Sequence, residues 1–219
     1  MIKPLRILVA DDHELVRKGL RSVFQSREGW TVCGEAATGR EAVEQALTLK
    51  PNVVVMDLTM PELNGLEATR QIHAKLPDTE ILILTMHHSE QLIHEVLAAG
   101  ARGYLLKTDA GHAVIDAVES LGRHQPFFTA GVSNLLLTSY LHPERSANGG
   151  AHAPQPLTPR EREVVQMIAE GKSSKDVASA LGISEGTAET HRTNLMRKLD
   201  IHSVSEIVRY AIRNNIIAP

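Results

Sequence analysis

The sequence predicts an α/β fold for residues 1–125, a doubly wound parallel sheet of five strands, followed by a small all-α domain of four helices in residues 157–219. Two observations support this division. Short aliphatic runs alternate with amphipathic stretches of helical spacing in the first part, as in parallel sheets covered by helices on both faces. After a segment rich in proline and glycine, signals for helix starts become dense.

Five aliphatic runs account for the predicted strands, since each is bounded by turn or charged residues. They are residues 6–10, 30–34, 52–56, 80–84 and 102–106. The stretches between them repeat apolar residues on one helical face. Examples are Leu15, Val16, Gly19, Leu20, Val23 and Phe24 in the first, Ala42, Val43, Ala46 and Leu47 in the second, and Leu92, Ile93, Val96 and Leu97 after the fourth run.

Residues 126–156 are interpreted as a linker in which a short helix can form. Its second half, from residue 142, carries three prolines and two glycines and few apolar residues. Beyond it, Thr158 and Glu161 form a predicted capping box with a proline between them. Ser173, Ser184 and Ser203 begin three further helices. Because only LGIS separates the second and third helices, the pattern predicts a helix-turn-helix.

The composition is ordinary for a soluble protein, with 42% hydrophobic residues and a formal net charge of -3. Residues 1–125 hold 13 Lys and Arg against 17 Asp and Glu, whereas residues 126–219 hold 10 against 9. Cys33 is the only cysteine, so an intrachain disulfide is impossible, and we interpret it as a structural thiol. The first apolar run is too short for a signal peptide or a membrane span, which predicts a cytoplasmic protein without membrane partners.

Polar side chains follow the predicted strands at the point where each strand ends. They are Asp11 and Asp12 after the first strand, Asp57 after the third, Thr85 after the fourth and Lys107 after the fifth. Ligands of open parallel sheets bind beyond the carboxyl ends of the strands, so these groups should converge. Three carboxylates about 4 Å apart repel by roughly 4 kcal/mol per pair at an effective dielectric constant of 20.

That repulsion requires a compensating cation. Lys107 supplies one charge, and a site of carboxylate oxygens suits Mg²⁺ better than a soft metal. A metal, a lysine and a hydroxyl around one carboxylate also stabilise a phosphoryl group in transfer. Asp57 is therefore predicted to be a nucleophile that becomes an aspartyl phosphate.

The set of Asp11, Asp12, Asp57, Thr85 and Lys107, together with Pro61 and Gly65 in DLTMPELNG, resembles the signature of a two-component receiver domain over residues 5–123, a domain with a flavodoxin-like fold. The resemblance implies that Asp57 accepts a phosphoryl group from the histidine of a sensor kinase. It also implies that Asp11 and Asp12 help Asp57 to hold Mg²⁺ and that Lys107 pairs with the phosphate. Thr85 would swing toward that phosphate and Tyr104 would rotate inward. Met86 is bulkier than the usual residue there, which bears on phosphoryl access and lifetime.

Two other chemistries deserve comparison. Phosphatases of the haloacid dehalogenase type also use an aspartate nucleophile with Mg²⁺, but they need a second aspartate two residues later as general acid. Thr59 occupies that position, so sustained turnover is not expected and the chain is not predicted to be an enzyme. His87, His88 and His94 suggest a metal site, but they lack i, i+4 spacing and a cysteine partner. They are interpreted as surface residues.

The third helix of the C-terminal domain has a polar face that suits either solvent or DNA. That helix lies in a segment, residues 157–203, that resembles the LuxR-type helix-turn-helix domain of response regulators of the NarL/FixJ class. By that resemblance the helix from Glu185 lies in the major groove of duplex DNA, with Glu189, Thr190 and Thr193 toward the base edges. Candidates for phosphate contacts, which set position rather than sequence, are Lys175, Thr187, His191, Arg192, Arg197 and Lys198.

A C-terminal domain with a net charge near +1 should bind DNA weakly by itself, and a homodimer on paired half-sites would correct this. The last helix offers a candidate dimerisation face in Val204, Ile207, Val208, Ala211 and Ile212, although core packing also explains this spacing. We expect the first domain to cover the DNA-reading helix at rest and to release it on phosphorylation. The alternative is a protein-interaction module whose helical domain does not read DNA.

Overall fold

The computed structural model describes residues 4–86, 89–141 and 157–217. Six strands and ten helices follow one another along these ranges. The strands are β1 (Leu5–Ala10), β2 (Trp30–Ala36), β3 (Val53–Asp57), β4 (Glu80–Thr85), β5 (Gly103–Leu106) and β6 (Phe127–Phe128). The helices are α1 (Glu14–Gln25), α2 (Gly39–Leu49), α3 (Gly65–Lys75), α4 (Glu90–Ala98), α5 (Ala110–Gly122), α6 (Ala130–Leu141), α8 (Pro159–Ala169), α9 (Ser174–Leu181), α10 (Glu185–Leu199) and α11 (Val204–Arg213).

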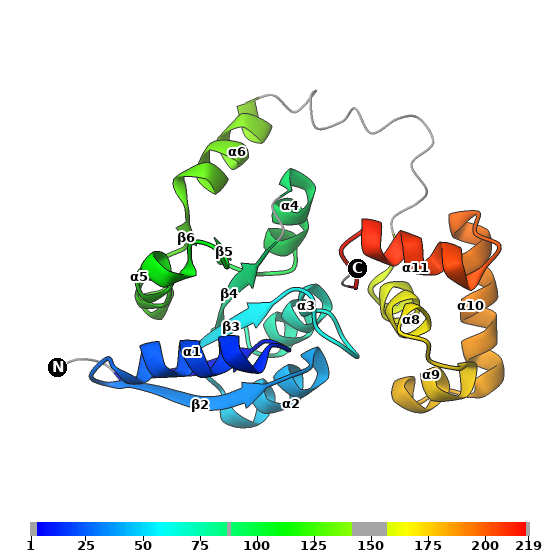
Figure 1. Ribbon diagram of the computed structural model, residues 1–219, viewed down its shortest axis with the longest axis horizontal. Helices are drawn as coiled ribbons and strands as arrows, with labels where there is room; N and C mark the ends of the chain where they lie inside the picture. Colours follow the sequence, from blue (N-terminus) through cyan, green and yellow to red (C-terminus); the bar gives the residue numbers. More distant parts are fainter. Residues whose placement is uncertain (1–3, 87–88, 142–156, 218–219) are drawn as a thin grey trace.

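The strands form one parallel sheet in the order β2-β1-β3-β4-β5-β6. Helices α2, α3 and α4 cover one face and α1 and α5 the other, and the sheet lies between them in Figure 1. The strands β3 and β4 are buried along their whole length, which explains their continuous Val, Ile and Leu content. The predicted doubly wound parallel sheet is therefore confirmed.

The predicted number of strands is one too low. Phe127 and Phe128 form β6, which pairs with Gly103 and Tyr104 of β5, and α6 then packs against α4. The segment interpreted as a linker thus begins with two elements of the sheet domain, by which we mean β1 to α6. Two residues are too few for a strand pattern, and this strand exists because the edge of β5 offers it hydrogen-bond partners.

Helices α8 to α11 form a separate C-terminal domain around a small aliphatic core. Its helix starts are those that the sequence predicts. Thr158, Ser173 and Ser203 each take part in a capping box, and Ser184 caps α10 by accepting a hydrogen bond from the Thr187 amide. Gly182 ends α9 in the left-handed conformation, which glycine adopts without steric cost. The predicted helix-turn-helix, α9 followed by α10, is confirmed.

Candidate functional site

An acidic cluster lies beyond the carboxyl ends of β1 and β3. These strands are neighbours in the sheet although β2 separates them in sequence, so this is the point where the chain switches its winding direction. Asp11 directly follows β1 and Asp57 is the last residue of β3. The predicted convergence of polar groups at this edge is therefore present in the fold.

Lys107 joins the two buried carboxylates of the cluster. Its Nζ lies 2.7 Å from Asp11 Oδ2 and 2.8 Å from Asp57 Oδ2. Asp11 is 1% exposed and Asp57 4% exposed. The lysine side chain is itself 13% exposed, so the ion pairs are shielded from water on most sides. Burial by itself would lower the pKa of Lys107, but Asp57 and Asp11 together raise it, and the side chain is a cation at neutral pH.

The pKa of Asp57 shows that its charge is only partly compensated. Burial raises the pKa of Asp57 to about 6, and this effect exceeds the opposite effect of Lys107. This pKa of about 6 already includes smaller upward contributions from the negative charges of Asp11 and Asp12. A site that holds an ionised carboxylate at this cost favours a second cation.

The cluster has the donor atoms that a hard divalent cation prefers. Carboxylate oxygens of Asp11, Asp12 and Asp57 and a ring nitrogen of His13 all lie within 4.8 Å of one another. Asp12 is exposed, which leaves room for water ligands. Oxygen ligands with space for water are what Mg²⁺ requires, so these residues fit a magnesium ion.

His13 is a member of this cluster that the sequence analysis missed. Its Nδ1 lies 2.6 Å from Asp12 Oδ1, and its backbone amide donates a hydrogen bond of 2.9 Å to Asp11 Oδ1. The signal was its position directly after the two aspartates, before the first turn of α1. The Arg17 guanidinium, which donates to the Asp11 carbonyl at 2.6 Å, was missed as well.

The predicted switch residues lie at the same edge or behind it. Thr85 is fully buried at the end of β4, and its carbonyl accepts a hydrogen bond of 2.8 Å from the Lys107 amide. Tyr104 lies in the core with its side chain fully buried, and burial raises its pKa to about 12. Met86, next to Thr85, is 65% exposed. His94 is a surface residue as predicted, whereas His87 and His88 lie outside the described residues.

The polar face of α10 is open to solvent. Six of the predicted DNA contacts are exposed, two are partly buried, and one is engaged in an ion pair. The exposed ones are Lys175 on α9 and Thr187, Glu189, Thr190, Thr193 and Arg197 on α10; His191 and Arg192 are partly buried. Lys198 Nζ lies 2.7 Å from Glu161 Oε2, so a phosphate would have to compete with that carboxylate.

The expectation that the sheet domain covers the DNA-reading helix is wrong for this arrangement. Hydrogen bonds and ion pairs instead join α8 to the loop between β3 and α3 and to α3 and α4. Figure 1 shows α8 facing that loop while α10 lies on the far side of the C-terminal domain. The reason is that α8 presents hydrogen-bonding groups to the sheet domain, a property that sequence periodicity did not reveal.

The candidate dimerisation residues on α11 divide into two groups. Ile207 and Ala211 are fully buried in the core of the C-terminal domain. Val204 is exposed, and Val208 and Ile212 are partly buried. These three share one stripe of α11 at a spacing of four residues, so only they are available for contact with another chain.

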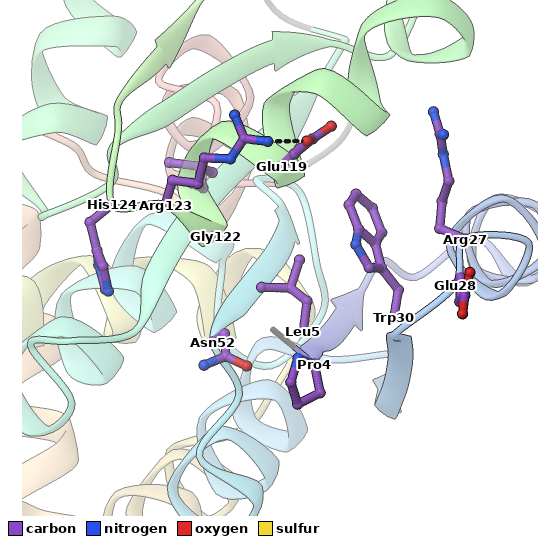
Figure 2. A pocket seen from close by; sticks show the side chains of 11 residues that line it. Pro4, Leu5, Arg27, Glu28, Trp30, Asn52, Glu119, Gly122, Arg123 and His124 are labelled. Atoms are coloured by element: carbon purple, nitrogen blue, oxygen red, sulfur yellow. Dashed lines mark hydrogen bonds and ion pairs between the residues drawn. The ribbon is translucent and has the colours of Figure 1, made fainter. Parts of the chain in front are cut away.

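A pocket lies at the opposite end of the sheet from the acidic cluster, near the start of β1 (Figure 2). It has a volume of about 500 Å³, and Arg27, Trp30, Glu119 and Arg123 are among the residues that line it. Arg123 pairs with Glu119, one helical turn earlier at the end of α5, so the charge of this guanidinium is already compensated. The pocket does not contribute to the acidic cluster, which lies beyond the other ends of the strands.

Comparison with known proteins agrees with the two parts of this site. Residues 7–119 match the family model of the response regulator receiver domain, and residues 155–211 match that of bacterial regulatory proteins of the luxR family. The chain is 37% identical over 213 residues to the transcriptional regulatory protein LiaR of Bacillus subtilis, covering 97% of this chain and 99% of that protein. It is 35% identical over 214 residues to MctR of Rhizobium johnstonii, covering 98% and 96%.

Solved structures show the same similarity. A complex of the two-component response regulator RcsB with DNA has a TM-score of 0.57 and 25% sequence identity, covering 95% of this chain and 98% of that one. The response regulator ChrA of a heme-sensing two-component system has a TM-score of 0.51 and 31% identity, covering 99% and 100%. In the part of the chain that the structure describes, no helix is long and apolar enough to cross a membrane.

Proposed function

Since this chain belongs to the two-component response regulators that join a receiver domain to a LuxR-type DNA-binding domain, we propose that it is a cytoplasmic transcription regulator controlled by phosphorylation of Asp57. A sensor histidine kinase supplies the phosphoryl group, and the phosphorylated chain binds paired promoter half-sites as a homodimer. The observation that carries this proposal is the buried Asp57 carboxylate, held by Lys107 beside two further aspartates, in a chain that also has an exposed helix-turn-helix face.

The proposed reaction uses Asp57 as the nucleophile. A carboxylate oxygen of Asp57 attacks the phosphorus of the kinase phosphohistidine, the phosphorus–nitrogen bond breaks, and the leaving imidazole takes a proton from solvent. Asp11, Asp12 and Asp57 would hold Mg²⁺, which when bound neutralises charge on the transferring group. Lys107 contributes a fixed positive charge at the same carboxylate and needs no rearrangement to do so.

The proposed switch uses groups that already lie next to the cluster. Thr85 is one strand away from Asp57, and its hydroxyl can donate to a phosphoryl oxygen. Tyr104, on the neighbouring strand β5, is already buried in the core and would keep the Thr85 hydroxyl directed toward the phosphoryl group. Phosphorylation replaces the single negative charge of the Asp57 carboxylate by up to two negative charges on the phosphoryl group at neutral pH, so it changes the balance of charge around these residues.

For the DNA-binding domain we propose that α10 enters the major groove. Glu189, Thr190 and Thr193 would contact base edges, and Lys175, Arg192 and Arg197 would contact phosphates together with Thr187, His191 and Lys198. The RcsB complex with DNA supports the assignment of this domain to DNA binding. Val204, Val208 and Ile212 of α11 would contact the second chain of a dimer, and Ile207 and Ala211 would support them from the core.

Glu189 is expected to determine part of the operator sequence. A carboxylate cannot bind the guanine acceptors in the major groove, but it accepts a hydrogen bond from cytosine N4. The Glu189→Lys variant should therefore prefer a different base at one position of each half-site. The free energy that discriminates between the two bases there should change by about 1–3 kcal/mol. Selection of binding sites from random duplex DNA measures this, with the exposed Glu185→Lys as a control of equal charge change. Identical base preference in Glu189→Lys and the native protein would contradict the assignment.

The experiment that tests the whole proposal is selection from a random pool of duplex DNA in the presence of Mg²⁺. Protein treated with a small acyl phosphate is compared with untreated protein and with Asp57→Ala. We expect paired half-sites to be enriched only when the donor is present and Asp57 is intact. Equal enrichment in donor-treated protein, untreated protein and Asp57→Ala would mean that Asp57 does not control DNA binding.

Absence of any enrichment would favour the second candidate, a module that binds protein partners through its phosphorylated receiver domain. A phosphatase is disfavoured because Thr59 stands where such enzymes carry a general acid. Sustained hydrolysis of small phosphomonoesters would support it instead, and the same protein preparation allows this to be measured.

A further inference from the structure

A histidine side chain reaches the acidic cluster from the start of α1. His13 directly follows Asp11 and Asp12 and precedes the first residue of α1. Its Nδ1 lies 2.6 Å from Asp12 Oδ1 and 3.4 Å from Asp11 Oδ1. The imidazole therefore lies against both aspartates, and it adds to the cluster a nitrogen ligand that carboxylates alone do not offer.

Helix α1 does not use this side chain for its start. His13 occupies the N-cap position with an extended backbone, and its side chain makes no capping hydrogen bond. Serine, threonine, aspartate and asparagine are the residues that stabilise an N-cap. Glu14, the acid in the first turn, pairs with Lys18 at 2.6 Å. Because the His13 side chain does not cap α1, its role lies with the two aspartates that it contacts.

The distances around His13 match those between neighbouring ligands of one metal ion. Ligands about 2.1 Å from an octahedral ion lie about 3 Å apart when they are adjacent and about 4 Å apart when they are opposite. The two distances from His13 Nδ1, 2.6 and 3.4 Å, lie on either side of the first value. One ligand atom each from Asp11, Asp12, Asp57 and His13 lies within 4.8 Å of the others. The four groups can therefore share a single divalent cation.

The His13 side chain can bind a cation through Nδ1 at little cost in solvation. It is 68% exposed, whereas the side chain of Asp11 is 2% exposed. A neutral imidazole carries its single proton on either ring nitrogen, so Nε2 can hold the proton while Nδ1 binds the ion. Lys107 Nζ lies 2.7 Å from Asp11 Oδ2, so the lysine and the imidazole approach different oxygens of that carboxylate.

We propose that the acidic cluster also binds a divalent transition-metal ion of the class of Ni²⁺, Co²⁺ and Zn²⁺, with His13 as the ligand that selects this class over Mg²⁺. This rests on the metal site of the proposed function, formed by Asp11, Asp12 and Asp57. Imidazole is a good ligand for these ions, whereas Mg²⁺ is held by oxygen atoms and gains little from a nitrogen. The chain thus accepts two kinds of cation at its phosphorylation site.

The two kinds of cation compete for the same carboxylates. The three aspartates of the cluster carry three negative charges, and Lys107 supplies one positive charge, which leaves a difference of two. One divalent ion neutralises this difference, and a second ion in the same place would be repelled by the first. An excess of Ni²⁺ should therefore displace Mg²⁺ from the receiver domain.

The test compares the binding of Ni²⁺ and Mg²⁺ to the full, unphosphorylated chain. Equilibrium dialysis measures the Ni²⁺ affinity, and the shift of the amide resonances of residues 11–13 measures the Mg²⁺ affinity. The variant is His13→Asn. Asparagine suits an N-cap and can still donate a hydrogen bond to Asp12, but its amide nitrogen does not bind metals. We expect Ni²⁺ affinity to fall by about 10-fold or more and Mg²⁺ affinity to change by less than about 3-fold.

The matched control is His202→Asn. His202 Nε2 lies 3.5 Å from Asp200 Oδ1, and both side chains are exposed. Among the described residues this pair does not belong to a group of three or more metal ligands. Only Ni²⁺ that excess Mg²⁺ displaces is counted, which leaves out ions held by other histidines. On this measure the control should stay within about 2-fold of the native chain, since it lies far from the cluster.

Three results would overturn the proposal. An equal loss of affinity for both ions in His13→Asn would mean that His13 only orients Asp12. Unchanged Ni²⁺ affinity in this variant would mean that Nδ1 is not a ligand. Ni²⁺ that excess Mg²⁺ does not displace from the native chain would be bound elsewhere. If neither ion binds the native chain, the metal site of the proposed function fails and this inference fails with it.

A second measurement identifies the ligand atom directly. In a chain labelled with ¹⁵N-histidine, one equivalent of Zn²⁺ should shift the Nδ1 resonance of one imidazole, and excess Mg²⁺ should reverse the shift. The shift should be absent from His13→Asn and present in His202→Asn. A shift that persists in His13→Asn would overturn the assignment of His13 as the ligand.

Discussion

Replacing Lys107 by methionine should destabilise the metal-free protein by about 3–5 kcal/mol at pH 7, as expected when one partner of a buried ion pair is removed. Two buried carboxylates would lose the cation that lies 2.7 Å from Asp11 and 2.8 Å from Asp57. Methionine keeps much of the volume of the lysine stem, so the effect measures charge more than packing. Chemical unfolding of the native chain and the variant, both in chelator, gives this difference.

The matched control is Lys18→Met. Lys18 pairs with Glu14 at 2.6 Å, a similar distance, but these side chains are 68% and 67% exposed. Exposed pairs of this kind contribute about 0–1 kcal/mol, so the control should change stability little. Added Mg²⁺ should restore part of the stability of Lys107→Met, because a second cation would again neutralise the carboxylates. A loss below about 1 kcal/mol for Lys107→Met would contradict the view that the carboxylates are ionised and uncompensated without it.

Replacing Asp57 by asparagine should have the opposite effect and stabilise the metal-free protein by about 3 kcal/mol at pH 7.5, which is the free energy of the pKa shift from 3.8 to about 6. The pKa of Asp57 is higher in the folded chain than in the unfolded chain, so the folded state binds the proton more tightly. The contribution of Asp57 to the free energy of unfolding is fully present below about pH 4, and it is lost as the pH rises through about 6. Asparagine is neutral and avoids this loss.

The pH dependence separates this cause from a change in packing. The advantage of Asp57→Asn should be largest above pH 6 and should vanish near pH 4. The exposed Asp116→Asn serves as a control and should stay within about 0.5 kcal/mol of the native chain at every pH. Mg²⁺ should reduce the difference, because it stabilises the native chain and binds the variant less well. Destabilisation by Asp57→Asn at pH 7.5 would show that the Lys107 ion pair outweighs the cost of burial.

Both predictions depend on the same property of the site, namely that the negative charge of Asp57 is only partly compensated before a cation or a phosphoryl group is added. Asp57 is charged at neutral pH at a cost in stability, and Lys107 limits that cost without removing it. Binding of Mg²⁺ or transfer of a phosphoryl group changes this balance of charge directly. Under the proposed function, this cost in free energy is what a bound cation or a phosphoryl group would change.

Much of the fold and the acidic cluster could be predicted because their signals are local in sequence. Aliphatic runs marked β1 to β5, and serine or threonine three residues before an acid marked the starts of α8, α9 and α11. Asp57 is the last residue of β3 and Lys107 directly follows β5. Since parallel strands all end at the same edge of the sheet, sequence position alone was enough to bring them together.

The tertiary structure decided the features that depend on partners distant in sequence. The strand β6 exists because the edge of β5 was free, and Tyr104 is buried by strands and helices that its own neighbours in sequence do not reveal. Gln166 interrupts an apolar run in α8, and sequence alone gave no way to know that its amide would bind Met60 and Asn64, which lie about a hundred residues earlier. Helix propensity and capping act within a few residues, whereas docking between domains depends on which unpaired groups meet across a surface. For this reason the sequence determined what this chain is, and only the tertiary structure decided that α8, and not the DNA-reading helix, faces the receiver domain.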